Sequence, residues 1–375
     1  MILSLLEKLF TNEELVEGEE SDYIGLVRDV EVFAIKSQIH HYLKDRTQTE
    51  RVTQLLSEQV KESSQRAAYQ NLMLRHELFH LLDVFDSEAI SVIPLKGVVF
   101  SEEYFGDFAA RGTADIDLFI RPSELQTAIA LVKEQGFTNE EEEDPTNNHC
   151  TFVKVNAGLS VSVELHWNLD KEYSSNVDPD IFWVNSEPYS DFKYVRVLSK
   201  QDTLYYTCLH AARHNMDSVK YFIDLLQIIT TFPSQIDFTE IKKRAKRDKT
   251  WRKVKAVLTI LYRECRFLHE IKPYRYATFV FWSLALARRT HTGKKNLAYY
   301  LYRFYFDYLL VDTPAFLITG AKWFHYINPP RMYLMYFLGE DRESISKWTL
   351  LKEYYRVMFH QPFNFKSVKS RGESS

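Results

Sequence analysis

The 375-residue sequence contains few of the residues that cross-link or interrupt a chain. Its three cysteines, Cys150, Cys208 and Cys265, stand far apart and form no C-x-x-C pair. Their spacing argues against both a disulfide framework and a structural zinc site. Glycine and proline number only 11 each, whereas aromatic residues reach 15%. Few breakers and many apolar side chains indicate a folded, largely helical protein.

Long apolar runs and a strong positive charge are also missing. No apolar run approaches the roughly 18 to 20 residues that a transmembrane helix needs, and the N-terminus lacks the basic start and cleavage site of a signal peptide. We therefore expect a cytoplasmic protein. The net charge of −4 gives no overall attraction to nucleic acid. The one basic stretch, residues 242–255, is interpreted as a solvated helix, with an anionic partner or a membrane surface as the alternative.

Two acidic residues on a candidate strand are the first sign of a chemical site. Residues 115–120 read DIDLFI, and side chains alternate between the two faces of a strand. Asp115 and Asp117 therefore point the same way, while the apolar side chains point into a core. Neighbouring carboxylates raise each other's pKa, and a hard cation such as Mg²⁺ removes that cost. The pattern alone also fits a solvated edge strand.

A third carboxylate lies on another candidate strand. In residues 159–169, LSVSVELHWNL, one face is wholly apolar and the other presents Glu164 and His166. This strand is predicted to form a hairpin with residues 150–155. Three carboxylates on two neighbouring strands can hold two divalent ions, Mg²⁺ or Mn²⁺, which suit an in-line displacement at phosphorus.

The carboxylate cluster leads to two expectations. The side chains of Asp115, Asp117 and Glu164 should lie on adjacent strands, about 4 to 6 Å from one another. Replacing Asp117 with asparagine should leave the fold intact, and should raise the melting temperature in metal-free buffer if repulsion between carboxylates is relieved.

These residues resemble a known family. The sequence LKG at residues 95–97, Arg111, DIDL at 115–118 and ELHW at 164–167 is similar to the uncharacterised bacterial nucleotidyltransferase family of the polymerase-beta superfamily. The similarity continues through LHAARH at residues 209–214 and FIDL at 222–225. The superfamily usually has Gly-Ser where this chain has Lys96-Gly97, and that serine contacts a phosphate.

The resemblance implies an α+β fold, in which a small mixed β-sheet is flanked by N-terminal helices and followed by a mostly helical C-terminal half. We predict N-terminal helices over residues 1–87 and a catalytic core over 88–198. A helical domain over 199–265 would close the cleft. An aromatic-rich helical region (266–361) and a disordered tail (362–375) would follow. Individual helices are predicted over 22–43, 49–86, 122–135 with Ser123 as N-cap, 200–215 with Ser199 as N-cap, and 221–231.

The implied activity is metal-dependent transfer of a nucleoside monophosphate from a nucleoside triphosphate to a hydroxyl of a small molecule or protein. Asp115, Asp117 and Glu164 would hold the ions, and Glu164 would also act as base or orient the acceptor. Phosphate would contact Lys96, Gly97 and Arg111, and His166 would bind phosphate or acceptor. The alternatives are a nucleotide-binding relative without turnover, and a docking protein whose aromatic C-terminal region contacts a protein or a membrane surface.

Two histidine pairs leave open alternatives. His76 and His80 stand one turn apart on a predicted helix and could bind a metal, although the surrounding leucines favour ordinary packing. His210 and His214 either line the nucleotide cleft or tie two helices together by hydrogen bonds.

Overall fold

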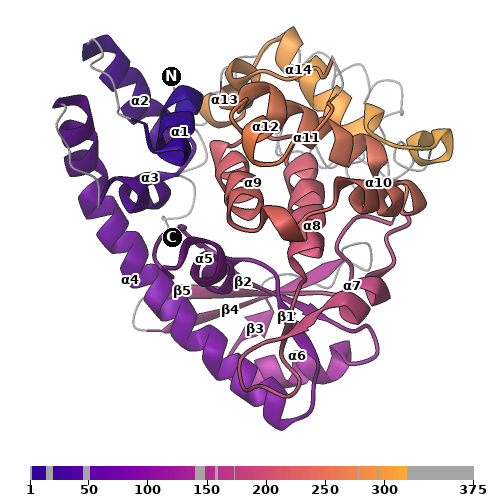
Figure 1. Cartoon of the computed structure of the whole chain (residues 1–375). Coiled ribbons are helices and arrows are strands. Elements are labelled where there is room, and N and C mark those ends of the chain that lie inside the picture. The colour runs from indigo at the N-terminus through magenta and orange to yellow at the C-terminus, as the bar shows by residue number, and fades with distance from the viewer. Residues whose placement is uncertain are drawn as a thin grey trace, which may run out of the picture. The chain divides into compact units, whose positions relative to one another are not determined.

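The computed structural model describes residues 2–13, 20–44, 51–139, 148–156, 159–172, 174–276, 279–293 and 295–318. The chain divides into two compact units, Met1–Asp312 and Thr313–Ser375, and all elements named below belong to the first (Figure 1). The finer division into five regions stays a prediction. The predicted tail and residues 319–361 of the aromatic-rich region lie outside the described residues.

A five-stranded mixed sheet carries the predicted site. Its strands are β1 (Val92–Pro94), β2 (Asp115–Ile120), β3 (Thr138–Asn139), β4 (His149–Asn156) and β5 (Leu159–His166), in the order β1-β2-β5-β4-β3. β2 pairs with β5 in parallel, and the other neighbours are antiparallel. The α+β fold, the mixed sheet and the β4–β5 hairpin are thereby confirmed. A separate two-stranded sheet joins β6 (Glu187–Pro188) and β7 (Arg196–Val197).

Alternation along the strands creates the first apolar core. The inward side chains of β2 and β5 share one buried cluster with those of three helices, α4 (Arg51–Ser87), α5 (Gly97–Phe105) and α6 (Leu125–Glu134). Helix α4 runs past α5 and the sheet in Figure 1. Because this cluster covers one face of the sheet, the polar side chains of β2 and β5 are left on the opposite face.

The leucines of α4 do not all pack against the sheet. Leu78 and Leu82 are buried in the cluster, but Leu55 and Leu72 are 37% and 49% exposed. His76 and His80 are exposed as well. Neither belongs to a group of potential metal ligands in the described part of the chain, and His80 Nε2 instead lies 2.8 Å from Gln135 Oε1.

Two of the predicted helices differ from the structure, one by a break inside it and one by its first residue. The single helix over 22–43 is two helices, α2 (Glu20–Val32) and α3 (Lys36–Leu43), because Ala34 between them adopts a φ of 52° that a helix cannot contain. Helix α6 begins three residues later than predicted, so Ser123 is not its N-cap. Helix α1 (Ile2–Thr11) precedes them.

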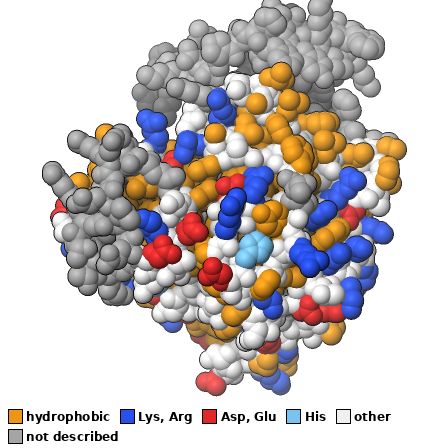
Figure 2. Space-filling view, turned by 45° about the horizontal axis from the view of Figure 1, so that its top comes forward, with side chains coloured by type: hydrophobic (Ala, Val, Ile, Leu, Met, Phe, Trp, Pro, Cys, Tyr) orange, Lys and Arg blue, Asp and Glu red, His pale blue; other side chains and the backbone are white. Residues whose placement is uncertain are grey.

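The basic stretch is not one helix either. It spans α10 (Phe238–Arg247) and α11 (Trp251–Glu264), which are separated where Lys249 has a φ of 56°. Basic side chains are interspersed with acidic and apolar ones on the face shown in Figure 2. The described side chains visible there therefore form no extended surface of one charge sign.

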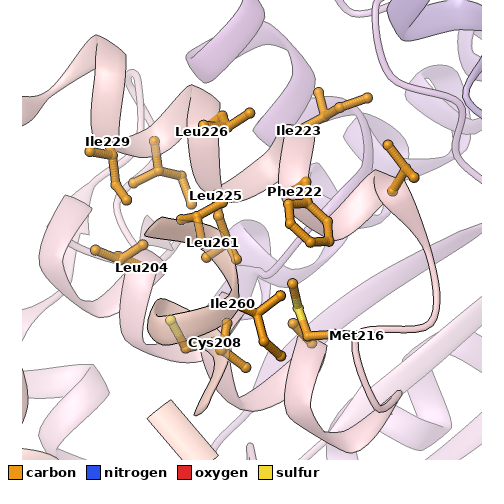
Figure 3. Packing of buried hydrophobic residues seen from close by; sticks show 14 of the residues in the cluster. Leu204, Cys208, Met216, Phe222, Ile223, Leu225, Leu226, Ile229, Ile260 and Leu261 are labelled. Atoms are coloured by element: carbon orange, nitrogen blue, oxygen red, sulfur yellow. The ribbon is translucent and has the colours of Figure 1, made fainter. Parts of the chain in front are cut away.

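The second apolar core lies among helices. Helices α8 (Lys200–Arg213) and α9 (Val219–Thr231) pack with α11 through side chains that include Cys208, Phe222 and Leu261 (Figure 3). Ser199 caps α8 as predicted, because its Oγ accepts a hydrogen bond from the backbone N–H of Asp202. The remaining elements are α7 (Pro179–Asn185), η1 (Pro233–Gln235), α12 (Leu268–Ile271), α13 (Leu284–Thr292), α14 (Leu297–Phe304) and η2 (Tyr305–Leu309). Within the described residues, every helix is too short or too polar to span a membrane.

Two leucines on α4 test which of its faces packs on the sheet. Leu82 is fully buried, so Leu82→Ala should lower the free energy of unfolding by about 2 to 5 kcal/mol. The matched Leu72→Ala change on the exposed face should cost less than about 0.5 kcal/mol. Urea unfolding measures both, and similar losses for the two variants would contradict this packing.

Candidate active site

The parallel pairing of β2 with β5 brings the three predicted carboxylates together. The register sets Asp117 beside Glu164, and Asp115 beside Ser162. One carboxylate oxygen from each of Asp115, Asp117 and Glu164 lies within 4.8 Å of the other two. The expected placement on adjacent strands is therefore found, while the assignment of these residues as metal ligands stays a prediction.

A glycine turn after β1 brings a lysine onto this cluster. Gly97 has a φ of 73°, which favours glycine, and a Cβ atom there would lie 3.2 Å from Thr113 Cγ2. The turn places Lys96 Nζ 3.1 Å from Asp117 Oδ2. Lys96, Gly97, Thr113, Asp115 and Asp117 line one small cavity, together with buried apolar side chains of the first core. The lysine that was predicted to meet phosphate thus pairs with a carboxylate in the protein alone.

His166 links two of the three carboxylates. Its Nε2 lies 2.9 Å from Asp117 Oδ1 and 3.2 Å from Glu164 Oε2. Burial lowers the pKa of His166, but hydrogen bonds to both carboxylates outweigh burial and raise it above its usual value. A proton on Nε2 therefore bridges Asp117 and Glu164. These contacts favour a role in orienting carboxylates over direct contact with an acceptor.

The two aspartates of β2 differ in their surroundings. Burial would raise the pKa of Asp117, yet Lys96 and His166 hold that pKa well below its usual range. Burial and the charge of Asp117 raise the pKa of Asp115, and Glu164 adds to the effect against the opposing charge of Lys96. The unfavourable interaction among the carboxylates therefore raises the pKa of Asp115 and not that of Asp117.

This difference reverses the expected effect of replacing Asp117. An asparagine at position 117 would leave the Lys96 ammonium and the His166 proton without their buried carboxylate, so it removes an attractive interaction. Relief of repulsion is expected instead from the same change at position 115. The D-x-D pattern predicted repulsion between the two carboxylates, but it did not indicate which aspartate the repulsion would destabilise.

Arg111 is already paired within the protein. Its Nε and Nη2 donate hydrogen bonds of 2.8 and 2.9 Å to the two carboxylate oxygens of Asp224, and both residues are buried. The pair holds helix α9 against the loop that leads into β2. Two of the five N–H donors of Arg111 are used in this way, and its contact with phosphate stays a prediction.

Helices α8 and α9 form a wall of the site. His210 Nε2 lies 3.3 Å from Lys96 Nζ, and the rings of His210 and His214 both contact the Tyr221 ring on α9, with centroids 5.5 and 5.9 Å away. That the pair lines a nucleotide cleft stays a prediction, and the contacts found between the two helices are ring contacts where hydrogen bonds were predicted. His210 contacts the site, and the ring contacts join the two helices.

Lys220 is a residue of this wall that the sequence did not indicate. Its Nζ donates a 2.9 Å hydrogen bond to the Gly112 carbonyl oxygen. Burial and the neighbouring Arg111 lower its pKa to about 7, although Asp224 and Asp115 oppose the shift. A lone lysine at the start of a helix carries no motif, so only the folded structure shows its nearness to Asp115.

The cluster has the donor set of a divalent-cation site. Carboxylate oxygens are the ligands that Mg²⁺ and Mn²⁺ prefer. Asp117 Oδ2 is buried and accepts no hydrogen bond within the described residues; Lys96 contacts it as an ion pair. A buried acceptor beside two further carboxylates fits a cation. Lys96 and His166 contact Asp117 directly as counter-charges, and Lys220 acts on Asp115.

The two aspartates should respond oppositely to amidation. In metal-free buffer at pH 7, Asp115→Asn should raise the melting temperature, and Asp117→Asn should lower the free energy of unfolding by about 3 kcal/mol or more. The raised pKa of Asp115 means that its charge costs stability only as pH rises, whereas the low pKa of Asp117 means that its contribution is lost as pH falls. Both differences should therefore shrink below about pH 4. Melting curves across pH measure them, and equal shifts of one sign would contradict the assignment of strain to Asp115.

The sequence was also compared with known proteins. The model of a family described as uncharacterised nucleotidyltransferase matches residues 28–264, more than half of the chain. The match spans the sheet, the three carboxylates and helices α8 and α9. No curated protein and no solved structure matches the chain.

Proposed function

The chain belongs to this uncharacterised nucleotidyltransferase family, and from that premise we propose that it is a metal-dependent enzyme with a nucleoside triphosphate as donor. It would transfer the nucleoside monophosphate to a hydroxyl on a small molecule or a protein. The observation that carries the proposal is the cluster of Asp115, Asp117 and Glu164, whose carboxylate oxygens lie within 4.8 Å of each other beside Lys96.

The carboxylates would hold Mg²⁺ or Mn²⁺. Bound there, such ions would neutralise triphosphate charge and activate the attacking oxygen. In the reaction the acceptor oxygen bonds to the α-phosphorus while the bond to pyrophosphate breaks, and the acceptor proton passes to solvent. The hydrogen bond from His166 lowers the pKa of Glu164 against the opposing effect of burial. A weakly basic Glu164 suits orientation of the acceptor hydroxyl better than removal of its proton.

Lys96 and its turn would bind phosphate. Helix α5 begins at Gly97, directly after Lys96, and the N-terminus of a helix attracts anions through its backbone N–H groups. Neutralisation of Asp117 by a cation would leave the Lys96 ammonium able to pair with a phosphate. Lys220 lies on the same wall and would add positive charge when protonated. Burial and the charge of Lys96 lower the pKa of His210 well below its usual value, so its ring would contact Lys96 as a neutral group.

Label transfer tests this proposal. The wild-type chain should transfer label from at least one α-labelled nucleoside triphosphate, with Mg²⁺ present and a cell extract as acceptor source. A γ-labelled triphosphate should give no transfer, because that phosphate leaves with pyrophosphate. Asp117→Asn and Glu164→Gln should each reduce transfer about 10³-fold or more, since positioning and charge neutralisation supply most of the catalysis.

A matched control tests whether the loss of an aspartate outside the site also reduces transfer. Asp180→Asn changes an aspartate whose side chain is 75% exposed and should leave transfer unchanged. If the acidic variants also transfer label like the wild type, the site lies elsewhere. If the wild type binds triphosphate but transfers nothing, the alternative of a nucleotide-binding protein without turnover takes its place.

A further inference from the structure

We propose that His149, Glu164 and His166 form a second metal site, which takes a transition-metal ion such as Zn²⁺ or Co²⁺. One ligand atom from each of the three residues lies within 4.8 Å of the other two. Two imidazoles and one carboxylate form a ligand set that suits these ions better than Mg²⁺, which prefers oxygen ligands. The inference does not depend on nucleotidyl transfer.

The register of the β4–β5 hairpin builds this ligand set. His149 lies directly opposite His166 in the antiparallel pairing, so their side chains share one face of the sheet. Glu164 precedes His166 by two residues and therefore points to the same face. The two imidazole rings are 5.0 Å apart between centroids. Ligands on two paired strands of a five-stranded sheet are held more rigidly than ligands on loops.

Burial makes the site protected but reachable. The His166 side chain is 7% exposed and that of Glu164 is 25% exposed, and His149 is half-buried. His166 Nε2 contacts both Asp117 and Glu164, so a metal ion bound through this nitrogen would displace the proton that it shares with the two carboxylates. Because Glu164 belongs to both ligand sets, the second site adjoins the carboxylate cluster and shares one ligand with it.

An alternative use of the same residues makes a different prediction. If His149 and His166 only neutralise and orient the carboxylates, a transition-metal ion should bind to the carboxylate cluster alone. Removing His149 should then leave the affinity for that ion unchanged. His149 belongs only to the proposed second site, and Asp115 belongs only to the carboxylate cluster. Variants of these two residues therefore distinguish the two arrangements.

Co²⁺ titration of the metal-free full-length chain tests the proposal. With excess Mg²⁺ present to occupy the carboxylate cluster, bound Co²⁺ should give visible absorption bands that saturate at about one ion per chain, and Zn²⁺ should remove these bands. His149→Phe keeps an aromatic ring beside His166 but removes the ligand, so it should weaken Co²⁺ binding more than about a hundredfold. Asp115→Asn removes a ligand of the carboxylate cluster alone, so it should weaken Co²⁺ binding far less than His149→Phe does.

A second variant at position 149 tests whether a loss of the absorption bands results from misfolding. His149→Gln removes the imidazole with a polar side chain, and it should lose the bands even where circular dichroism and melting match the wild type. Wild-type absorption bands in both His149 variants would overturn the proposal. So would the absence of bands in the wild type, or their loss in Asp115→Asn to the same extent as in His149→Phe.

Discussion

Parallel pairing between β2 and β5 is the constraint on which the site depends. It sets Asp117 against Glu164 and leaves Asp115 on the same face, a concentration of negative charge that folding alone would not favour. The protein offsets this charge from both sides of the pair. Lys96 reaches Asp117 from the turn after β1, and His166 reaches it from β5. Asp115 is the aspartate whose pKa stays raised in spite of these counter-charges.

The helical half holds the wall of this site in place. Buried Arg111 forms a bidentate pair with Asp224, 113 residues further along the chain, and so fixes α9 beside the loop before β2. The core between α8, α9 and α11 sets the position of His210, which contacts Lys96. The region that matches the family model therefore includes the three carboxylates and also the basic and aromatic side chains opposite them.

The sequence predicted the parts of the site that follow from strand periodicity. Alternation in residues 115–120 and 159–166 was enough to place the three carboxylates on one face, and the Lys-Gly pair indicated the turn. The partners of Lys96 and Arg111 were not predictable, because each pair joins segments that only the tertiary fold brings together. Helix breaks at Ala34 and Lys249 were missed because neither is the glycine that usually adopts a positive φ. His149 was missed because a single histidine at the start of a strand carries no pattern until its register with His166 is known.

The proposed function requires that the carboxylate cluster hold a divalent cation together with a triphosphate. Calorimetric titration of a nucleoside triphosphate into the wild-type chain, once with Mg²⁺ and once with a chelator, tests it most directly. We expect triphosphate binding with Mg²⁺ that is lost with the chelator, and a rise in melting temperature only when both metal and nucleotide are present. Equal triphosphate affinity under the two conditions would contradict it.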